Sequence, residues 1–289
     1  MFFSAFHVLI LSVLIAALYR PTDSGNIFRN DFPESSDPLR ILLVTAHPDD
    51  ECLFFAPTIL ALTNRSRLAD ASIKQENDNE LFSLCLSIGD ADGLGHIRRE
   101  EYEKSLDVLG IKDTNRIVLD DPHLQDNMGV SWDPIYIAGV VDDFVLQYNI
   151  TTILTFDRGG VSGHPNHKSI PDGIKRMISA YAKYSDSIPP KLYMLITVPL
   201  TIKYDRLALM LERFGYENAH ASVGDKYDHG EAMPVFVAGI GDYLTALQAM
   251  RQHWSQLVWF RWLNVMFSRY MWVNEWAEVR LTVQDNYTI

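Results

Sequence analysis

The chain has 289 residues, of which 47% are hydrophobic, and a formal net charge of -12. This length and composition are typical of a globular protein with a sizeable core, arranged as one large domain or two small ones. The negative charge argues against broad non-specific binding to nucleic acid, because such binding needs a cationic surface. The two cysteines, Cys52 and Cys85, lie in apolar stretches, so we expect buried thiols in a reducing compartment rather than a disulfide.

The first segment of the chain is an apolar run from Phe2 to Tyr19 that contains no Lys or Arg. Eighteen helical residues extend about 27 Å, close to the thickness of the hydrocarbon core of a bilayer. We therefore predict a transmembrane anchor over residues 1–20.

Three arginines follow this run, at Arg20, Arg29 and Arg40. Positive residues are enriched on the cytoplasmic side of a membrane span, so they favour a cytosolic location for the rest of the chain. A cleaved signal peptide is the alternative, since Ala16 and Ala17 offer a weak cleavage site. The preferred interpretation is an uncleaved single-span anchor.

Residues 21–38 are polar and punctuated by proline and glycine, which predicts a linker before a folded domain over residues 39–289. In that domain we predict strands at 40–45, 80–87, 116–119, 151–156 and 191–198. Helices are predicted at 52–63, 97–109, 134–148, 167–183, 203–214 and 242–253, the first of them with a late start or a kink at Pro57. Alternation of strands and helices predicts an α/β, Rossmann-like three-layer fold with a mainly parallel sheet.

The C-terminal region is rich in tryptophan and arginine, including Trp254, Trp259 and Trp262. Two interpretations remain open for it. The favoured one is a final layer of the core with arginines at the surface. The other is a surface that touches a membrane, because indole and guanidinium groups suit the membrane interface.

The densest group of polar residues follows the first predicted strand, in the segment Ala46-His47-Pro48-Asp49-Asp50-Glu51. The end of a strand in an α/β protein is where ligands bind. Burying several carboxylates there must be offset by a metal, another cation or a proton. A second cluster, Gly163-His164-Pro165-Asn166-His167, follows the predicted strand 151–156. Two strand ends that carry His and Asp predict one site.

A catalytic zinc site commonly has three protein ligands and leaves a fourth position for water. The two clusters supply His47, Asp50 and His167 as candidate ligands. Asp49 is then free to take a proton from water whose pKa the metal lowers towards about 7. Pro165 suits the first position of a helix, which places His164 beside the metal, where it can donate a hydrogen bond to a developing oxyanion.

Each of these residues also has a simple structural explanation: a histidine can be a hydrogen-bonded core residue, and an aspartate after a strand can cap a helix. The coincidence of the two clusters favours catalysis. Glu51 has no specific predicted role beyond orienting ligands or capping the helix. The donor set does not decide the metal, because iron also fits two histidines and a carboxylate.

The segment His47-Pro48-Asp49-Asp50-Glu51, together with His164 and His167, resembles the zinc-dependent de-N-acetylase family. The segments 54–58, 91–95, 159–164, 259–261 and 268–270 resemble more closely its eukaryotic branch, which acts in glycosylphosphatidylinositol-anchor synthesis. The resemblance implies zinc ligands at His47, Asp50 and His167, a general base at Asp49, and stabilisation of the tetrahedral intermediate or protonation of the amine by His164. It also implies a substrate contact at Arg98, whose alternative is a solvated charge on a helix.

The implied function is a hydrolase that removes the N-acetyl group from N-acetylglucosaminyl-phosphatidylinositol and releases acetate. The resemblance further implies a glycolipid substrate, an endoplasmic reticulum membrane location and a catalytic domain that faces the cytosol, with no nucleic-acid partner. One alternative is a de-N-acetylase of a soluble amino-sugar conjugate. The other is a membrane-tethered binding protein that has lost catalysis.

Overall fold

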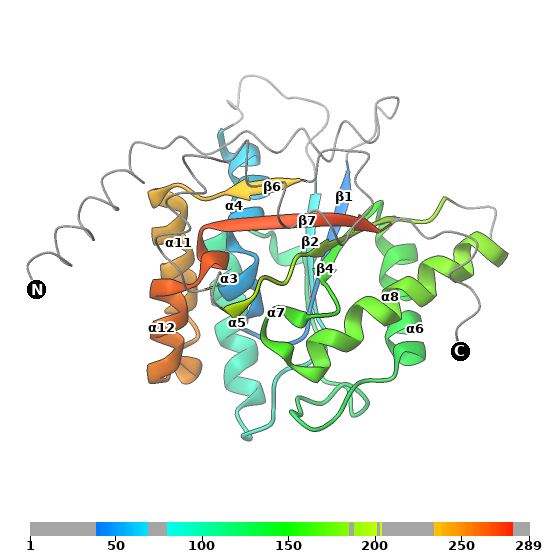
Figure 1. Cartoon of the computed structure of the whole chain (residues 1–289), viewed down its shortest axis with the longest axis horizontal. Helices are drawn as coiled ribbons and strands as arrows, with labels where there is room; N and C mark the ends of the chain where they lie inside the picture. The colour runs from blue at the N-terminus through cyan, green and yellow to red at the C-terminus, as the bar shows by residue number, and fades with distance from the viewer. Residues whose placement is uncertain (1–38, 69–79, 185–187, 201–202, 204–233, 280–289) are drawn as a thin grey trace, which may run out of the picture.

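A computed structural model of the chain describes residues 39–68, 80–184, 188–200, 203 and 234–279. In this part, seven strands form one sheet in the order β3-β2-β1-β4-β5-β7-β6 (Figure 1). Their bounds are β1 Arg40–Thr45, β2 Glu80–Cys85, β3 Arg116–Val118, β4 Thr152–Phe156, β5 Lys191–Leu195, β6 Val235–Val237 and β7 Val273–Val279. Strands β1 to β5 are parallel to one another, whereas β7 is antiparallel to both β5 and β6. The predicted α/β fold with a mainly parallel sheet is confirmed.

Helices cover both faces of this sheet. On one side α6 and α8 pack against each other, and on the other α4, α5 and α11 form the second layer (Figure 1). The helices are α3 Asp50–Phe54, α4 Ala56–Leu68, α5 Gly95–Leu109, α6 Pro134–Tyr148, α7 Gly160–Gly163, α8 Pro165–Tyr184, α11 Ile240–Met250 and α12 Trp259–Phe267. Short 3-10 turns lie at Asp113–Asn115, Trp254–Gln256 and Arg269–Met271. None of the helices in the described ranges is long and apolar enough to cross a bilayer.

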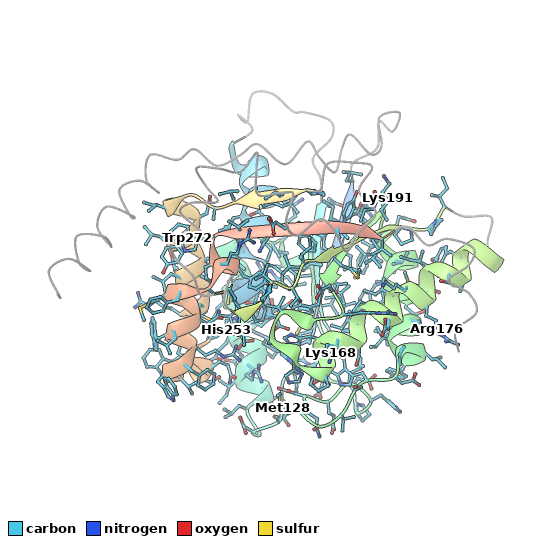
Figure 2. All side chains as sticks on the ribbon, in the orientation of Figure 1. Met128, Lys168, Arg176, Lys191, His253 and Trp272 are labelled. Carbon is cyan, nitrogen blue, oxygen red and sulfur yellow. The ribbon has the colours of Figure 1, made fainter. Side chains whose placement is uncertain are left out.

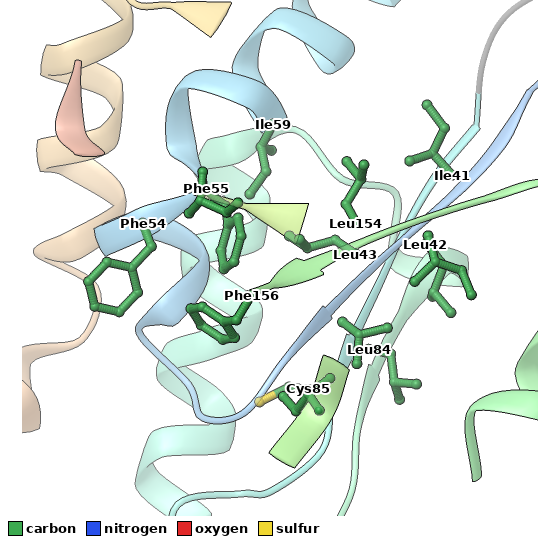
Figure 3. Packing of buried hydrophobic residues seen from close by; sticks show 14 of the residues in the cluster. Ile41, Leu42, Leu43, Phe54, Phe55, Ile59, Leu84, Cys85, Leu154 and Phe156 are labelled. Atoms are coloured by element: carbon green, nitrogen blue, oxygen red, sulfur yellow. The ribbon is translucent and has the colours of Figure 1, made fainter. Parts of the chain in front are cut away.

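The core lies on both faces of the central strands. All five residues of β4 are buried, and β1 and β2 are buried after their first residue. This continuous burial is expected for parallel strands between two helical layers. Figure 3 shows Leu43 of β1 and Leu154 and Phe156 of β4 in one cluster with Phe55, which lies between α3 and α4. Cys52 and Cys85 are buried free thiols, as predicted.

The local sequence explains where α6 and α8 begin. Asp133 accepts a hydrogen bond from the Ile135 amide, and Pro134 occupies the first turn of α6. This is a favourable start, because the side chain satisfies a free amide and proline needs none. Pro165 opens α8 in the same way, as predicted, and this leaves His164 just before the helix.

The predicted helix over 52–63 is wrong in detail, because two helices with a break at Phe55 occupy this stretch. Pro57 lies in the first turn of α4, the position where a missing amide hydrogen costs least. The break is held from far away in the chain: the side chain of Asn274 in β7 accepts from the Thr58 amide and donates to the Phe54 carbonyl. No local pattern indicates such a contact.

The predicted strand 191–198 ends earlier, at Leu195. Its last residues have other partners: the Thr197 amide donates to the Asp157 carboxylate, and the Val198 amide donates to the Tyr270 hydroxyl. The sequence analysis also missed β6 and β7. The transmembrane anchor over 1–20, the linker 21–38 and all but one residue of the predicted helix 203–214 lie outside the described residues.

The favoured interpretation of the C-terminal region as core is right for Trp276, which is fully buried. It is wrong for Trp254, Trp259 and Trp262, which are exposed. The two groups differ in secondary structure, since Trp276 lies on β7 inside the sheet and Trp259 and Trp262 lie on α12 at its margin.

The topology places a crevice at the ends of β1 and β4. The two strands are neighbours, yet the chain leaves β1 towards the α4 layer and leaves β4 towards the α8 layer (Figure 1). Ligands of open α/β sheets bind at such a switch point, outside the carboxyl ends of the strands. Both clusters singled out by the sequence lie there.

Candidate active site

The site is built from the loops that follow β1 and β4. His47, Asp49 and Asp50 follow β1, and His164 and His167 stand at the start of α8. All but His164 are almost completely buried. The structure therefore brings together every residue that the sequence analysis proposed as a metal ligand.

The imidazole of His47 has its Nε2 fixed by two oxygens. Asn166 Oδ1 lies 3.1 Å and Asp126 Oδ1 3.3 Å from it. The amide of Asn166 is itself oriented, because its Nδ2 donates to the Val130 carbonyl. Two acceptors require a proton on Nε2, so the other nitrogen, Nδ1, offers a free lone pair. Burial lowers the pKa of His47 to about 3, which keeps the ring neutral.

The imidazole of His167 is oriented by the backbone. Its Nδ1 donates to the carbonyl of Gly160 over 3.0 Å, which leaves Nε2 with a lone pair. Gly160 has a φ of +62°, and a Cβ at this position would lie 2.9 Å from the Cβ of His167. Only glycine permits this close approach. Burial lowers the pKa of His167 well below its usual value, so this ring is neutral too.

The carboxylate of Asp50 divides its oxygens between two functions. Oδ2 accepts hydrogen bonds from the amides of Ala46 and His47 at 3.0 and 2.9 Å. Oδ1 lies 3.3 Å from Nε2 of His167. Burial and the neighbouring Asp49 raise the pKa of Asp50 well above its usual value. A nearby cation would favour the ionised form.

His167 Nε2 faces both of the other candidate ligands, because it lies 3.3 Å from His47 Nδ1 and 3.3 Å from Asp50 Oδ1. Ligands around a tetrahedral zinc ion, about 2.0–2.1 Å from the metal, are about 3.3 Å apart. Two imidazole lone pairs that face each other across this distance have no proton to share. Two neutral imidazoles and a carboxylate therefore fit a divalent metal ion.

His164 lies close to this group, and the nitrogens of the three histidines are within 4.8 Å of one another. Its Nδ1 accepts a hydrogen bond from the Asn166 amide, so its proton is on Nε2, 3.6 Å from Asp126 Oδ1. A protonated nitrogen is a hydrogen-bond donor and not a ligand. This arrangement separates His164 from the two histidines that present lone pairs.

Asp49 is held in an unusual backbone conformation, with a φ of 107°. Non-glycine residues adopt such angles rarely and at a cost in energy, most often at functional sites. Oδ2 of its carboxylate lies 2.9 Å from Nη2 of Arg261 on α12, whereas the carboxylate of Asp50 contacts His167 and the loop amides. The two adjacent aspartates thus face different partners.

Glu51 stabilises the strained backbone at Asp49 through hydrogen bonds of its carboxylate. Its Oε2 accepts a hydrogen bond from the Asp49 amide, and its Oε1 accepts from Ser105. Oε1 also lies 2.6 Å from His253 Nε2. Despite complete burial, which opposes both charges, each partner favours the other's ionised form: the pKa of Glu51 is lowered and that of His253 is raised. At 2.6 Å the two atoms are directly hydrogen-bonded and leave no space for a metal between them.

Asp126 connects three parts of the site. Its oxygens lie near Nε2 of His47, Nε2 of His164 and Nη1 of Arg98, the last at 3.2 Å. The hydrogen bond from His164 and the charges of His47 and Arg98 outweigh burial and hold the pKa of Asp126 well below its usual range. The sequence analysis missed Asp126, because it lies in a loop without a recognisable motif.

Arg98 lies beneath the site, with a side chain only 8% exposed. Its Nη1 donates to the Gly89 carbonyl and its Nη2 to the Pro48 carbonyl. It therefore braces the loop that carries the aspartates. The substrate contact expected of Arg98 stays a prediction.

A cavity of about 520 Å³ adjoins the site on the side of α12. Phe54 and Ser162 line the cavity, and both also approach His167. The remaining lining residues are Lys203 and, from α12, Phe260, Arg261, Leu263, Asn264 and Phe267. The cavity is thus mostly apolar, with two cationic side chains.

The chain is similar in sequence to a family of named de-N-acetylases. Residues 42–178 match the family model described as PIG-L: GlcNAc-PI de-N-acetylase. An N-acetylglucosaminyl-phosphatidylinositol de-N-acetylase from Bos taurus is 35% identical over 81% of this chain and 81% of its own length. The chain belongs to the GlcNAc-PI de-N-acetylase family. A probable member from Schizosaccharomyces pombe is 33% identical over 80% of this chain and 83% of its own length.

The family fold is shared with distant deacetylases. The N,N'-diacetylchitobiose deacetylase from Pyrococcus horikoshii covers 88% of this chain and 91% of its own, with a TM-score of 0.53 and 14% identity. At this identity the likeness establishes the fold alone. Family membership makes the chain a deacetylase by class, and His47, Asp50 and His167 give this family member a donor set that fits a divalent metal.

Proposed function

We propose that this chain is a hydrolase that removes the N-acetyl group of N-acetylglucosaminyl-phosphatidylinositol in glycosylphosphatidylinositol-anchor biosynthesis. The products are glucosaminyl-phosphatidylinositol and acetate. The observation that carries the proposal is the set of relatives named for this substrate, which align with about four fifths of the chain. The buried histidine and aspartate cluster at the ends of β1 and β4 supports it chemically.

His47, Asp50 and His167 would hold the metal, and zinc is the ion that we propose, although iron fits the same donors. A divalent ion there supplies Lewis-acid polarisation of a carbonyl and lowers the pKa of water. The two histidines are already in the tautomers that a metal requires, since Asn166 and Gly160 bind their outer nitrogens.

Asp49 carries the transferred proton, and His164 stabilises the oxyanion. Asp49 accepts the proton of the water whose oxygen attacks the acetamide carbon. His164 carries its proton on Nε2, directed towards Asp126. It donates a hydrogen bond to the developing oxyanion. The proton that Asp49 accepted from water passes to the nitrogen as the carbon–nitrogen bond breaks. Acetate and the free amine result.

The cellular setting follows from the N-terminal sequence. The apolar run over 1–20 would anchor the chain in the endoplasmic reticulum membrane, and residues 39–289 would form the catalytic domain in the cytosol. A lipid substrate is consistent with such an anchor. Residues 39–289 contain three N-glycosylation sequons, Asn64-Arg65-Ser66, Asn149-Ile150-Thr151 and Asn286-Tyr287-Thr288. A test for glycans on them would decide the orientation, since a cytosolic domain carries no N-linked glycan.

The direct test is to measure release of the free amine from N-acetylglucosaminyl-phosphatidylinositol by the purified full chain. Asp49→Asn should lower kcat about a thousand-fold, because it removes the proton acceptor but keeps the side-chain shape. Asp143→Asn, an exposed acid on α6, is the matched control and should leave kcat unchanged.

The same assay separates the alternatives. Preferential deacetylation of a soluble amino-sugar conjugate would identify a different substrate on the same scaffold. Binding of both compounds without release of acetate would identify a protein that has lost catalysis. Activity of Asp49→Asn equal to that of the unmodified chain would remove Asp49 from the mechanism.

A further inference from the structure

One helix beside the site has large apolar side chains that face solvent. Trp259 on α12 is 75% exposed, and Trp254 in the preceding turn is 77% exposed. Trp262 and Met266 follow Trp259 at helical spacing and are exposed as well. These four residues form what we call the outer α12 face, and Figure 2 shows side chains projecting outward from α12 at the edge of the molecule. Exposed apolar patches of this kind mark binding surfaces.

The charge around this face differs from that of the chain. Between Arg251 and Trp272 there are three arginines and no Asp or Glu, although the whole chain has 37 acidic residues. Of these arginines, Arg251 is exposed, Arg261 is half-buried and contacts Asp49, and Arg269 is buried and paired with Glu275. A tryptophan-rich surface from a segment with an exposed arginine and no acid matches a phospholipid headgroup region, where indole rings lie at the interface and cations meet phosphates. The nine residues of α12 extend about 13.5 Å, which is too short to cross a bilayer but suited to lying on one.

The outer face also adjoins the route to the catalytic residues. The next row of α12, Phe260 and Leu263, lines the cavity and is itself partly exposed. Arg261 also lines the cavity and reaches Asp49. A second protein bound to the outer α12 face would obstruct access to the cavity, whereas a bilayer would bring lipids to it.

We propose that the outer α12 face rests in the interface of a phospholipid bilayer and turns the mouth of the cavity towards the lipid. This inference rests on the proposed function in one respect, namely that the substrate is a lipid in the membrane. It adds the surface by which the folded domain approaches that lipid, independently of the N-terminal residues.

The first test measures membrane contact without using the reaction. The full chain is mixed with vesicles of brominated phosphatidylcholine and phosphatidylinositol, and quenching of tryptophan fluorescence is recorded. The Trp259→Phe/Trp262→Phe double variant should lose at least half of the quenching of the unmodified chain. Trp276→Phe, which alters a buried ring, should keep it. Equal quenching in the double variant and the unmodified chain would overturn the proposal.

The second test uses the reaction on two forms of the substrate. A Trp259→Ser/Trp262→Ser/Met266→Ser variant of the full chain should deacetylate vesicle-embedded N-acetylglucosaminyl-phosphatidylinositol at least ten-fold more slowly than the unmodified chain. Its rate on the soluble headgroup without acyl chains should stay within two-fold. The control is Ile135→Ser/Leu146→Ser, which removes side chains on α6 of similar exposure, 60% and 62%, and should change neither rate.

The outcomes distinguish the two proposals. An unmodified chain that acts on neither substrate refutes the proposed function, and the quenching experiment still decides the inference. Equal vesicle rates in the triple variant and the unmodified chain refute the inference alone. Loss of self-association in the triple variant, measured by light scattering and without any change in quenching, would identify a second copy as the occupant and overturn the bilayer.

Discussion

Three side chains at the candidate site, those of His47, Asp50 and His167, have one polar atom hydrogen-bonded to the surrounding protein. The second polar atom of each faces another of the three. Oδ2 of Asp50 accepts hydrogen bonds from the backbone amides of the loop, and Oδ1 lies 3.3 Å from His167 Nε2. The two ring nitrogens of His47 and of His167 divide their contacts in the same way. Outer contacts of this kind set the tautomer and the direction of each ligand before a metal arrives. At this scale the unanticipated residue is Asp126, since nothing in its local sequence marks it.

Asp126 should act by positioning His47 and His164. Asp126→Asn keeps the size of the side chain but removes the charge that faces both rings and Arg98. We expect deacetylase activity or metal affinity to fall by about 10- to 100-fold. Asp120→Asn, a nearby exposed acid, serves as the control in the same kinetic and metal-competition assays. Unchanged values in Asp126→Asn would contradict a positioning role.

His253 should contribute stability that depends on pH. Its pKa is raised in the folded protein by Glu51 despite burial, so its contribution is complete below the unfolded pKa, about 6.5. That contribution is lost as pH rises through the folded pKa. The difference in Tm between the unmodified chain and His253→Gln should therefore be largest near pH 6 and shrink as the pH is raised towards about 9. A Tm difference that is constant over this range would show that the ion pair is not what stabilises the turn under Asp49.

At the scale of elements, the turn between β4 and α8 determines where His167 points. Gly160 has a positive φ, and Val161 beside it, with a φ of 58°, shares this unusual conformation. Asp157, at the end of β4, accepts hydrogen bonds from the amides of Gly159 and Gly160. Hydrogen bonds therefore fix the turn at both ends, to Asp157 after β4 and to His167 on α8.

Substitution of Gly160 tests this turn directly. Gly160→Ala adds a Cβ that would lie 2.9 Å from the Cβ of His167, so the imidazole must move away from its partners. We expect a loss of metal affinity of about ten-fold or more. Gly241→Ala on α11, where no atom lies within 4 Å of the added Cβ, should bind metal normally. Equal metal affinity in the two variants would show that the turn does not fix His167.

Elements with a strong local signal were predictable. Helix α6 has a capping aspartate and a proline at its start, and its predicted bounds are those of the structure. The break between α3 and α4 and the early end of β5 were not predictable, because Asn274, Asp157 and Tyr270 impose them from distant parts of the chain. The proximity of the candidate ligands was predictable because each lies directly after an apolar strand or at the start of a helix, while their role as ligands stays a prediction.

At the scale of the whole molecule, the C-terminal segment completes the domain and the site. Strand β7 extends the sheet on the far side of β5, and its Asn274 holds the break beside Phe54. His253 and Arg261 reach Glu51 and Asp49 from the same segment. The loop after β1 is thus supported by residues some two hundred positions later in the chain. The sheet topology brings these distant residues together, and no sequence motif indicates their contacts.

The central claim is that His47, Asp50 and His167 hold one divalent metal on which deacetylation depends. The most direct measurement is a titration of the metal-free full chain with Zn²⁺, in which bound metal and acetate release from N-acetylglucosaminyl-phosphatidylinositol are followed together. Activity should rise in proportion to bound metal up to one ion per chain, and His167→Ala should show neither tight binding nor activity. Full activity of the metal-free chain, or unchanged metal binding in His167→Ala, would contradict the claim.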